Sequence, residues 1–162
     1  MSDESGADRA SALIRELRLE PHPEGGWYRQ TFRSERVVRR DDDERSALTA
    51  IFFLLRRGEI SRWHRVASDE VWTHVEGDGV KLWRFDGSTA QSELLAPLTS
   101  GGAPYLIVPR DEWQAAEPIG DYALVACFVA PGFDFADFEM MGGDANARRL
   151  IEDSYPELVR FV

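Results

Sequence analysis

Residues 58–77 read GEISRWHRVASDEVWTHVEG and contain His64, Glu70 and His74, two of the three histidines of the chain. The pattern around the polar residues 67–69 predicts two short strands joined by a turn. In the second strand Glu70, Trp72 and His74 share one face, because side chains two residues apart point the same way. If this face lines a barrel, two imidazoles and a carboxylate enter one cavity. There they could hold a metal ion, transfer a proton or only line a pocket.

The rest of the chain shows short strand patterns, with helical patterns only near its ends. Strands are expected at residues 27–33, 46–55, 80–85, 91–95, 105–108, 113–115 and 122–130, and helices at 7–19 and 144–153. Strands that recur about every 8 to 12 residues, without βαβ alternation, predict an all-β antiparallel sandwich or barrel with short flanking helices. We expect one domain over residues 1–162, with an acidic segment and helix at 1–19, the barrel at 20–140, and a helix and tail at 141–162.

The segment PHPEGG at residues 21–26 cannot form a helix and predicts a defined turn before the strand at 27–33. This segment is either only a rigid turn or part of the rim of a ligand site. In the second case its backbone amides, together with Tyr28 or Arg29, contact the ligand. Alternation places Tyr28, Gln30 and Phe32 on one face of the strand and Arg29 and Arg33 on the other. His22 is expected to be an exposed loop histidine.

Composition excludes several classes of function. The formal net charge is −10 and Lys81 is the sole lysine, so binding to nucleic acid through phosphate attraction is not expected. The five arginines of residues 33–45 form a basic cluster that contains the acidic run at residues 41–44, which predicts a self-neutralised surface loop. No apolar run reaches the roughly 18 residues of a membrane span, and the N-terminus lacks an apolar signal region, so we expect a cytoplasmic protein. Cys127 lies in an apolar strand pattern and is expected to be buried.

Several motifs resemble those of the cupin superfamily. Gly58, His64, Glu70 and Gly77 have the spacing of the first cupin motif, with Val66 in place of its second histidine. The second motif survives only as a remnant, with Pro109 in place, Asp111 where glycine is expected and Gln114 where histidine is expected. The strings PHPEGGWYRQTFRS, AIFFLLRRGEISRWHRVASDEVWTHVEG and APGFDFADFE are similar to the fifth catalogued cupin family, whose function is unknown.

The resemblance covers roughly residues 10–158 and implies a homodimeric double-stranded β-helix, the cupin jelly roll, with a central pocket. Such proteins are often compared with the dTDP-4-dehydrorhamnose 3,5-epimerase type of cupin. A typical cupin metal site has three histidines and one glutamate, and the matching positions here offer only His64, Glu70 and Gln114 as ligands. His74 lies about 13 Å beyond Glu70 at strand rise, too far to bind the same ion. A divalent metal is therefore a possible cofactor, and no cofactor is certain.

The sequence leads to one functional hypothesis and two alternatives. We expect a small-molecule ligand, sugar- or nucleotide-like, and an acid–base isomerase or epimerase in which His64, Glu70 and Tyr28 are catalytic. The expected ligand-binding residues are Ser61, Trp72, His74, Gln114 and Arg29. The first alternative is a non-catalytic ligand-binding or sensing module, because an apolar cavity with few polar groups also fits binding alone. The second is a metal-dependent enzyme.

Overall fold

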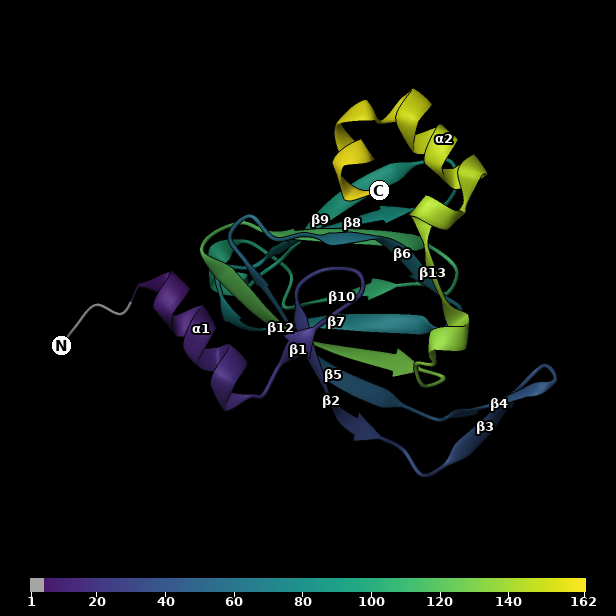
Figure 1. The fold of residues 1–162 in the computed structure, drawn as a ribbon, viewed down its shortest axis with the longest axis horizontal. Coiled ribbons are helices and arrows are strands. Elements are labelled where there is room, and N and C mark those ends of the chain that lie inside the picture. The colour runs from purple at the N-terminus through teal and green to yellow at the C-terminus, as the bar shows by residue number, and fades with distance from the viewer. Residues whose placement is uncertain (1–4) are drawn as a thin grey trace.

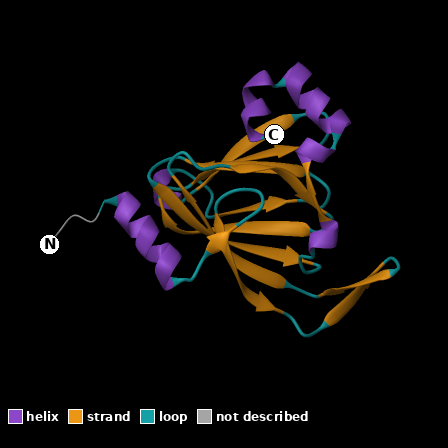
Figure 2. Ribbon diagram, in the orientation of Figure 1, coloured by secondary structure: helices purple, strands orange, loops and turns teal. Residues whose placement is uncertain are grey.

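Two antiparallel β-sheets face each other in the computed structural model, which describes residues 5–162 (Figure 1). The first four residues of the acidic N-terminal segment lie outside the described residues. The six-stranded sheet has the order β1-β2-β5-β12-β7-β10 and the five-stranded sheet the order β13-β6-β11-β8-β9. The helices flank this jelly roll and do not interrupt it (Figure 2), which confirms the predicted fold class.

The six-stranded sheet consists of β1 (Glu20–Pro21), β2 (Trp27–Arg33), β5 (Thr49–Arg56), β7 (Asp69–Gly77), β10 (Tyr105–Val108) and β12 (Tyr122–Ala130). The five-stranded sheet consists of β6 (Ser61–Val66), β8 (Val80–Phe85), β9 (Ala90–Leu95), β11 (Trp113–Pro118) and β13 (Phe138–Met140). The α-helices are α1 (Gly6–Glu16) and α2 (Ala145–Ser154), and short 3-10 helices span Leu98–Ser100, Phe135–Asp137, Met141–Gly143 and Pro156–Phe161. The bounds of β2, β8, β10 and β12 are those predicted from alternation.

Three apolar clusters hold these layers together. The central cluster lies between the sheets and joins Phe53 and Trp72 of one sheet to Leu82 of the other. A second cluster lies under α2, and a third lies under α1, where Leu13 packs against β5 and β12. Burial of such side chains stabilises a fold by about 1.5–3 kcal/mol each. Phe53, Trp72 and Cys127 of the central cluster also line a cavity between the sheets.

Helix α1 ends three residues earlier than predicted. Leu17 caps the helix, and Arg18 has φ 53, a left-handed conformation that stops the helical hydrogen bonding. The helix is tied to the barrel by Arg9, whose guanidinium donates to Glu76 at 2.7 and 3.0 Å. The hydroxyl of Tyr122 donates to the same carboxylate.

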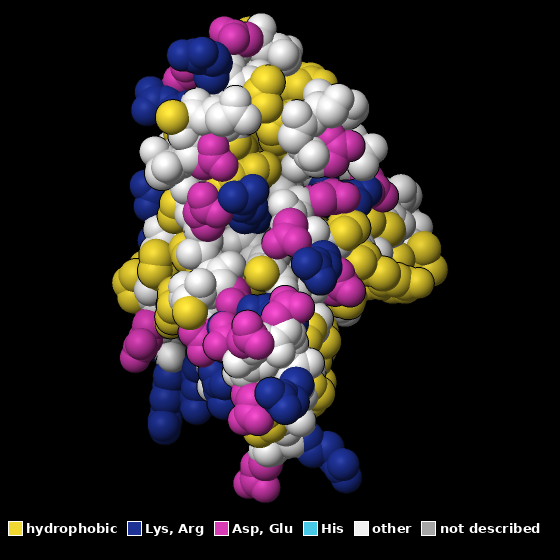
Figure 3. All heavy atoms as spheres, turned by 90° about the vertical axis from the view of Figure 1, so that its right-hand side faces the viewer, with side chains coloured by type: hydrophobic (Ala, Val, Ile, Leu, Met, Phe, Trp, Pro, Cys, Tyr) yellow, Lys and Arg dark blue, Asp and Glu magenta, His cyan; other side chains and the backbone are white. Residues whose placement is uncertain are grey.

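The predicted charged loop at residues 33–45 is instead a hairpin of β3 (Val37–Arg40) and β4 (Asp43–Ser46) that projects from the barrel (Figure 1). The prediction of a self-neutralised loop was wrong, because Arg40 and Arg45 both pair with Asp137, at 2.6 and 2.8 Å. These ion pairs fasten the hairpin to the 3-10 turn at Phe135–Asp137. Acidic and basic side chains are interspersed over the face from which the hairpin projects (Figure 3).

Candidate functional site

A cavity of about 370 Å³ lies between the two sheets, next to the central cluster. It is walled by β2, β5, β7 and β12 on one side, by β6 on the other, and by the loop before β13. Its wall is aromatic and aliphatic, with ionisable and amide side chains at a few places, as in many small-molecule sites. The lining residues are His22, Glu24, Tyr28, Gln30, Arg33, Thr49, Ile51, Phe53, His64, Val66, Glu70, Trp72, Cys127, Val129, Phe133, Asp134, Phe135 and Phe138.

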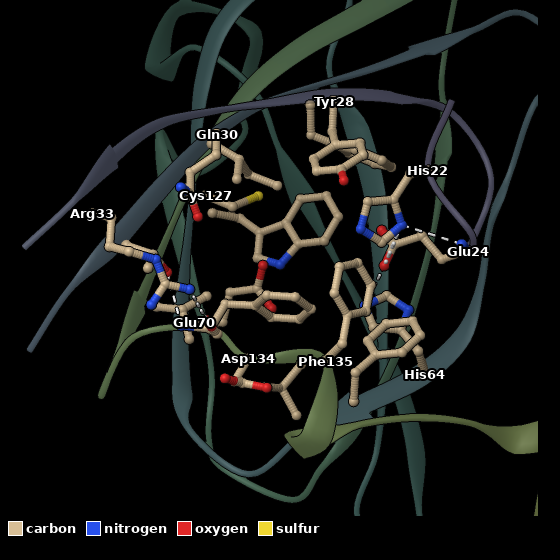
Figure 4. A pocket seen from close by; sticks show the side chains of 18 residues that line it. His22, Glu24, Tyr28, Gln30, Arg33, His64, Glu70, Cys127, Asp134 and Phe135 are labelled. Atoms are coloured by element: carbon tan, nitrogen blue, oxygen red, sulfur yellow. Dashed lines mark hydrogen bonds and ion pairs between the residues drawn. The ribbon is translucent and has the colours of Figure 1, made fainter. Parts of the chain in front are cut away.

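The turn between β1 and β2 inserts His22 and Glu24 into this cavity (Figure 4). The turn is closed by hydrogen bonds from the backbone N of His22 to the carbonyl of Gly26 and from the N of Gly25 to the carbonyl of His22. Gly25 has φ 109, and a Cβ there would lie 2.1 Å from the carbonyl oxygen of Ile60, so the position requires glycine. The prolines and glycines of the turn therefore fix where the two ionisable side chains point.

Glu24 and His64 form a buried contact in which one proton is shared. Nδ1 of His64 lies 2.7 Å from the carbonyl oxygen of Arg62, which can only accept, so Nδ1 carries a proton. Nε2 of His64 lies 3.1 Å from Oε2 of Glu24, and Ser61 donates to Oε1 of the same carboxyl group at 3.0 Å. The Glu24–His64 contact thus holds one further proton, on the carboxyl group or on the imidazole.

The surroundings favour the carboxylic acid over the ion pair. The side chains of His64 and Glu24 are 3% and 8% exposed. Burial raises the pKa of Glu24 to about 8 and outweighs the opposing effect of the Ser61 hydrogen bond. Burial also lowers the pKa of His64, against the opposing charge of Glu70. At neutral pH the contact is therefore a protonated Glu24 donating to a neutral imidazole.

His22 is neutral for the same physical reason. Burial, and secondly the proximity of His64, lower the pKa of His22 to about 3. Its Nδ1 accepts from the backbone N of Glu24 at 3.2 Å, which leaves the proton on Nε2. The prediction of an exposed loop histidine was wrong, because the turn folds inward and the side chain is only 6% exposed.

Glu70 is held by a second, separate network. Its Oε2 accepts from Nε2 of Gln114 at 2.7 Å, and the indole N–H of Trp72 donates to Oε1 of Gln114 at 2.8 Å. Cys127, buried as predicted, lines the same cavity. Burial raises the pKa of Glu70 to about 6, and the hydrogen bond from Gln114 limits the rise. Two buried carboxyl groups in one cavity thus differ in pKa, with Glu70 ionised and Glu24 protonated near pH 7.

The structure brings together some of the residues predicted for the site. Tyr28, His64, Glu70 and Trp72 line the cavity, and the ring of Tyr28 contacts His22 edge-on at 4.5 Å between centroids.

The other four predicted residues do not line the cavity. Ser61 and Gln114 lie behind the wall and orient Glu24 and Glu70. Arg29 donates to the carbonyl of Leu17 outside the barrel, and Nε2 of His74 contacts the carbonyl of Gly77 at 2.9 Å.

Sequence reasoning missed His22, Glu24 and Arg33. The first two could have been found, because two prolines and two glycines in six residues predict a rigid turn that aims its side chains. Arg33 was assigned to the wrong face, because a register shift in the β2–β5 pairing between Gln30 and Phe32 reverses the alternation. Arg33 therefore lines the cavity and Phe32 is 52% exposed.

The donor set does not fit the metal ion of a typical cupin site. Val66 offers no ligand, and Gln114 turns its amide nitrogen, which cannot bind a cation, toward Glu70. The orientation is fixed because the indole of Trp72 can only donate, so the amide oxygen must face it. Within residues 5–162 no group of three His, Cys, Asp or Glu side chains is arranged to hold a metal ion.

The protein is a cupin. Its two antiparallel sheets face each other and enclose a cavity, and His64 and Glu70 of the first cupin motif lie in the cavity wall. Residues 11–141 match the model of a cupin superfamily family, DUF985, and the chain belongs to this family, whose function is unknown. No curated protein matches the chain.

Solved structures agree with this assignment. A protein from Shewanella oneidensis is 32% identical, with a TM-score of 0.79 and 94% of this chain and 95% of that chain covered. A hypothetical protein from Leishmania major is 29% identical, with a TM-score of 0.79 and coverage of 94% and 96%. KdgF from Halomonas sp., at 15% identity, a TM-score of 0.53 and coverage of 73% and 91%, shares the fold alone. No helix within the described residues is long and apolar enough to cross a membrane.

Proposed function

We propose that the protein is an acid–base isomerase or epimerase that binds a small, partly apolar molecule in this cavity. The observation that carries the proposal is a pair of buried carboxyl groups in one cavity, Glu24 against His64 and Ser61 and Glu70 against Gln114. These different surroundings separate their pKa values, about 8 for Glu24 and about 6 for Glu70. Environments that separate the pKa values of two carboxyl groups are typical of sites in which one acts as base and the other as acid.

The proposed reaction is proton transfer next to a carbonyl group. Glu70, ionised at neutral pH, removes the proton from the carbon α to the carbonyl. Glu24 donates the one proton of the Glu24–His64 contact to the carbonyl oxygen as the enol forms, which leaves Glu24 as a carboxylate and His64 with only its Nδ1 proton. In the return step Glu24 takes a proton back from an enol oxygen while Glu70 delivers its proton to carbon. Delivery to the neighbouring carbon of an enediol moves the carbonyl, and delivery to the opposite face of the original carbon, after the enol has turned in the cavity, inverts its configuration.

Two further residues support this chemistry. Tyr28 lies in the cavity wall against His22, and its hydroxyl is available to hydrogen-bond a substrate oxygen. His22, kept neutral by burial, presents its Nε2–H as a donor. The aromatic wall excludes water from the reacting carbon, which strengthens these hydrogen bonds.

Solvent exchange tests the proposal. The protein is incubated in D₂O with a panel of nucleotide sugars, free keto sugars and small keto acids, and deuterium at carbon is measured by mass spectrometry. We expect incorporation into at least one compound, a rate that rises through about pH 6 and falls above about pH 8, and loss of exchange in Glu70→Gln. The proposal would be contradicted if no compound that binds incorporated deuterium and if His64→Ala bound these compounds as tightly as the wild type. That result would favour a ligand-binding module.

A further inference from the structure

The cavity has a second polar region, opposite the acid–base pair. Figure 4 shows His22, Glu24 and His64 together on one side and Gln30 and Arg33 on the other. Thr49 of β5 also lines the cavity, and its register partner on β2 is Arg33.

The guanidinium of Arg33 has N–H groups that are not used in hydrogen bonds within the described residues. The register shift in β2 turns its side chain into the cavity, where one Nη2–H donates to the carbonyl of Phe133 at 3.1 Å. Arg40 and Arg45 pair with Asp137, but among residues 5–162 Arg33 has no carboxylate within 4.0 Å. A guanidinium has five N–H donors in a planar fork, so most of those of Arg33 face the cavity and solvent.

Thr49 and Gln30 add further donors beside it. Oγ1 of Thr49, which is 1% exposed, accepts from the backbone N of Phe133 at 2.8 Å. Its own hydroxyl proton has no acceptor within the described part of the chain and can be donated into the cavity. Gln30 contributes an amide NH₂. Donors from three residues therefore converge on one region, which is the arrangement that binds an oxyanion.

Two carboxyl groups limit the charge of that anion. Asp134 lines the cavity, with Oδ1 accepting from the backbone N of Ala136 at 2.9 Å, and Glu70 lies in the same cavity. Neither pairs with Arg33, so both carboxylates repel an anion bound there. A single negative charge is therefore favoured over the double charge of a phosphate monoester.

We propose that Arg33, Thr49 and Gln30 form a subsite for a carboxylate group of the substrate. Much of the remaining cavity wall is apolar, formed by residues such as Phe53, Trp72 and Phe138. The substrate class is then a small organic acid with a carboxylate at one end, an apolar or ring-shaped body, and a carbonyl at the other. The position of the carbonyl rests on the proposed function, whereas the carboxylate subsite rests on contacts of its own.

Binding of model compounds tests the subsite without any turnover. Calorimetry compares 3-phenylpropanoate, the neutral 3-phenylpropanamide and phenyl phosphate on the full chain. We expect the carboxylate to bind about 10- to 100-fold more tightly than the amide, because hydrogen bonds to charged groups have about this effect. Arg33→Gln should remove this difference. Asp134→Asn should tighten carboxylate binding severalfold, because it removes a repelling charge.

The control variant is Arg36→Gln, an exposed arginine of the same segment that does not line the cavity. It should bind the carboxylate as the wild type does, and far-UV circular dichroism should show every variant folded. Four results would each overturn the proposal. The wild type could bind the carboxylate and the amide equally, bind phenyl phosphate more tightly than the carboxylate, or fail to bind the carboxylate at millimolar concentration. Alternatively, Arg33→Gln could still prefer the carboxylate to the amide. The two proposals can fail separately. If the proposed function is wrong, no deuterium is incorporated in the exchange experiment, but the carboxylate still binds more tightly than the amide.

Discussion

Substitution of Glu24 by glutamine should make the stability of the protein much less dependent on pH. The amide resembles the protonated carboxyl group, since it keeps an acceptor oxygen for Ser61 and donates an N–H toward Nε2 of His64. The substitution therefore preserves the contacts of the buried pair and removes only the ionisation. If Glu24 is protonated in the folded protein at neutral pH, the variant folds as well as the wild type or better.

The magnitude follows from the pKa of Glu24, about 8 in the folded protein against 4.5 as the ordinary value. Between these pH values the folded protein binds the proton more tightly than the unfolded chain, so its contribution to stability is complete below pH 4.5 and declines as pH rises to 8. The slope is about 1.4 kcal/mol per pH unit, so the wild type should lose about 3 kcal/mol relative to the variant between pH 5 and pH 8.

Urea unfolding at pH 5, 6, 7 and 8 measures this difference. Contributions of His22 and Glu70 are common to both proteins and largely cancel in the comparison. Glu152→Gln, on the outer surface of α2, is the matched control and should change the pH dependence little. A constant difference between wild type and Glu24→Gln across the range would refute the reasoning. So would a loss of several kcal/mol at every pH, which would indicate an ionised Glu24 paired with an imidazolium.

Three further predictions concern the metal, the turn and the hairpin. Elemental analysis of the purified protein should find little Fe, Mn, Zn or Ni after incubation with each, whereas the double variant Val66→His/Gln114→His should retain metal; equal uptake by both would contradict the donor-set argument. Gly25→Ala should lower the free energy of unfolding by about 1–3 kcal/mol, because its φ is positive and its Cβ would overlap the Ile60 carbonyl, and an unchanged urea midpoint would show the turn to be less constrained. Asp137→Asn should weaken both ion pairs that fasten the β3–β4 hairpin and so speed its cleavage by trypsin, whereas an unchanged cleavage rate would mean that backbone contacts hold the hairpin.

Much of the fold could be predicted because alternation in strands is a local property. The strand at 122–130 is apolar enough to be placed between two neighbours, and its bounds are those observed. The register shift beside Thr31 could not be predicted, because one extra residue in a strand depends on the pairing with β5 and leaves no clear pattern in the sequence. That single irregularity decides that Arg33 faces the cavity.

Only part of the site could be predicted, because some of its contacts also depend on segments that are distant in the sequence. His64 and Glu70 stand out because they lie on strands whose faces can be assigned from spacing alone. The partner of each depends on contacts between distant segments, since Glu24 reaches His64 from a turn 40 residues earlier and Gln114 reaches Glu70 from 44 residues later. Such pairings, and the burial that changes the pKa values, arise only when the two sheets close on each other.

The protonation of the two carboxyl groups is the central claim, and carbon-13 NMR measures it directly. Protein labelled at the side-chain carboxyl carbon of glutamate is titrated from pH 4 to pH 9, and the signals of Glu24 and Glu70 are assigned from Glu24→Gln and Glu70→Gln. We predict that Glu70 titrates near pH 6 and Glu24 near pH 8. Titration of both groups near pH 4.5, the ordinary value for glutamate, would contradict the assignment of Glu24 as acid and Glu70 as base.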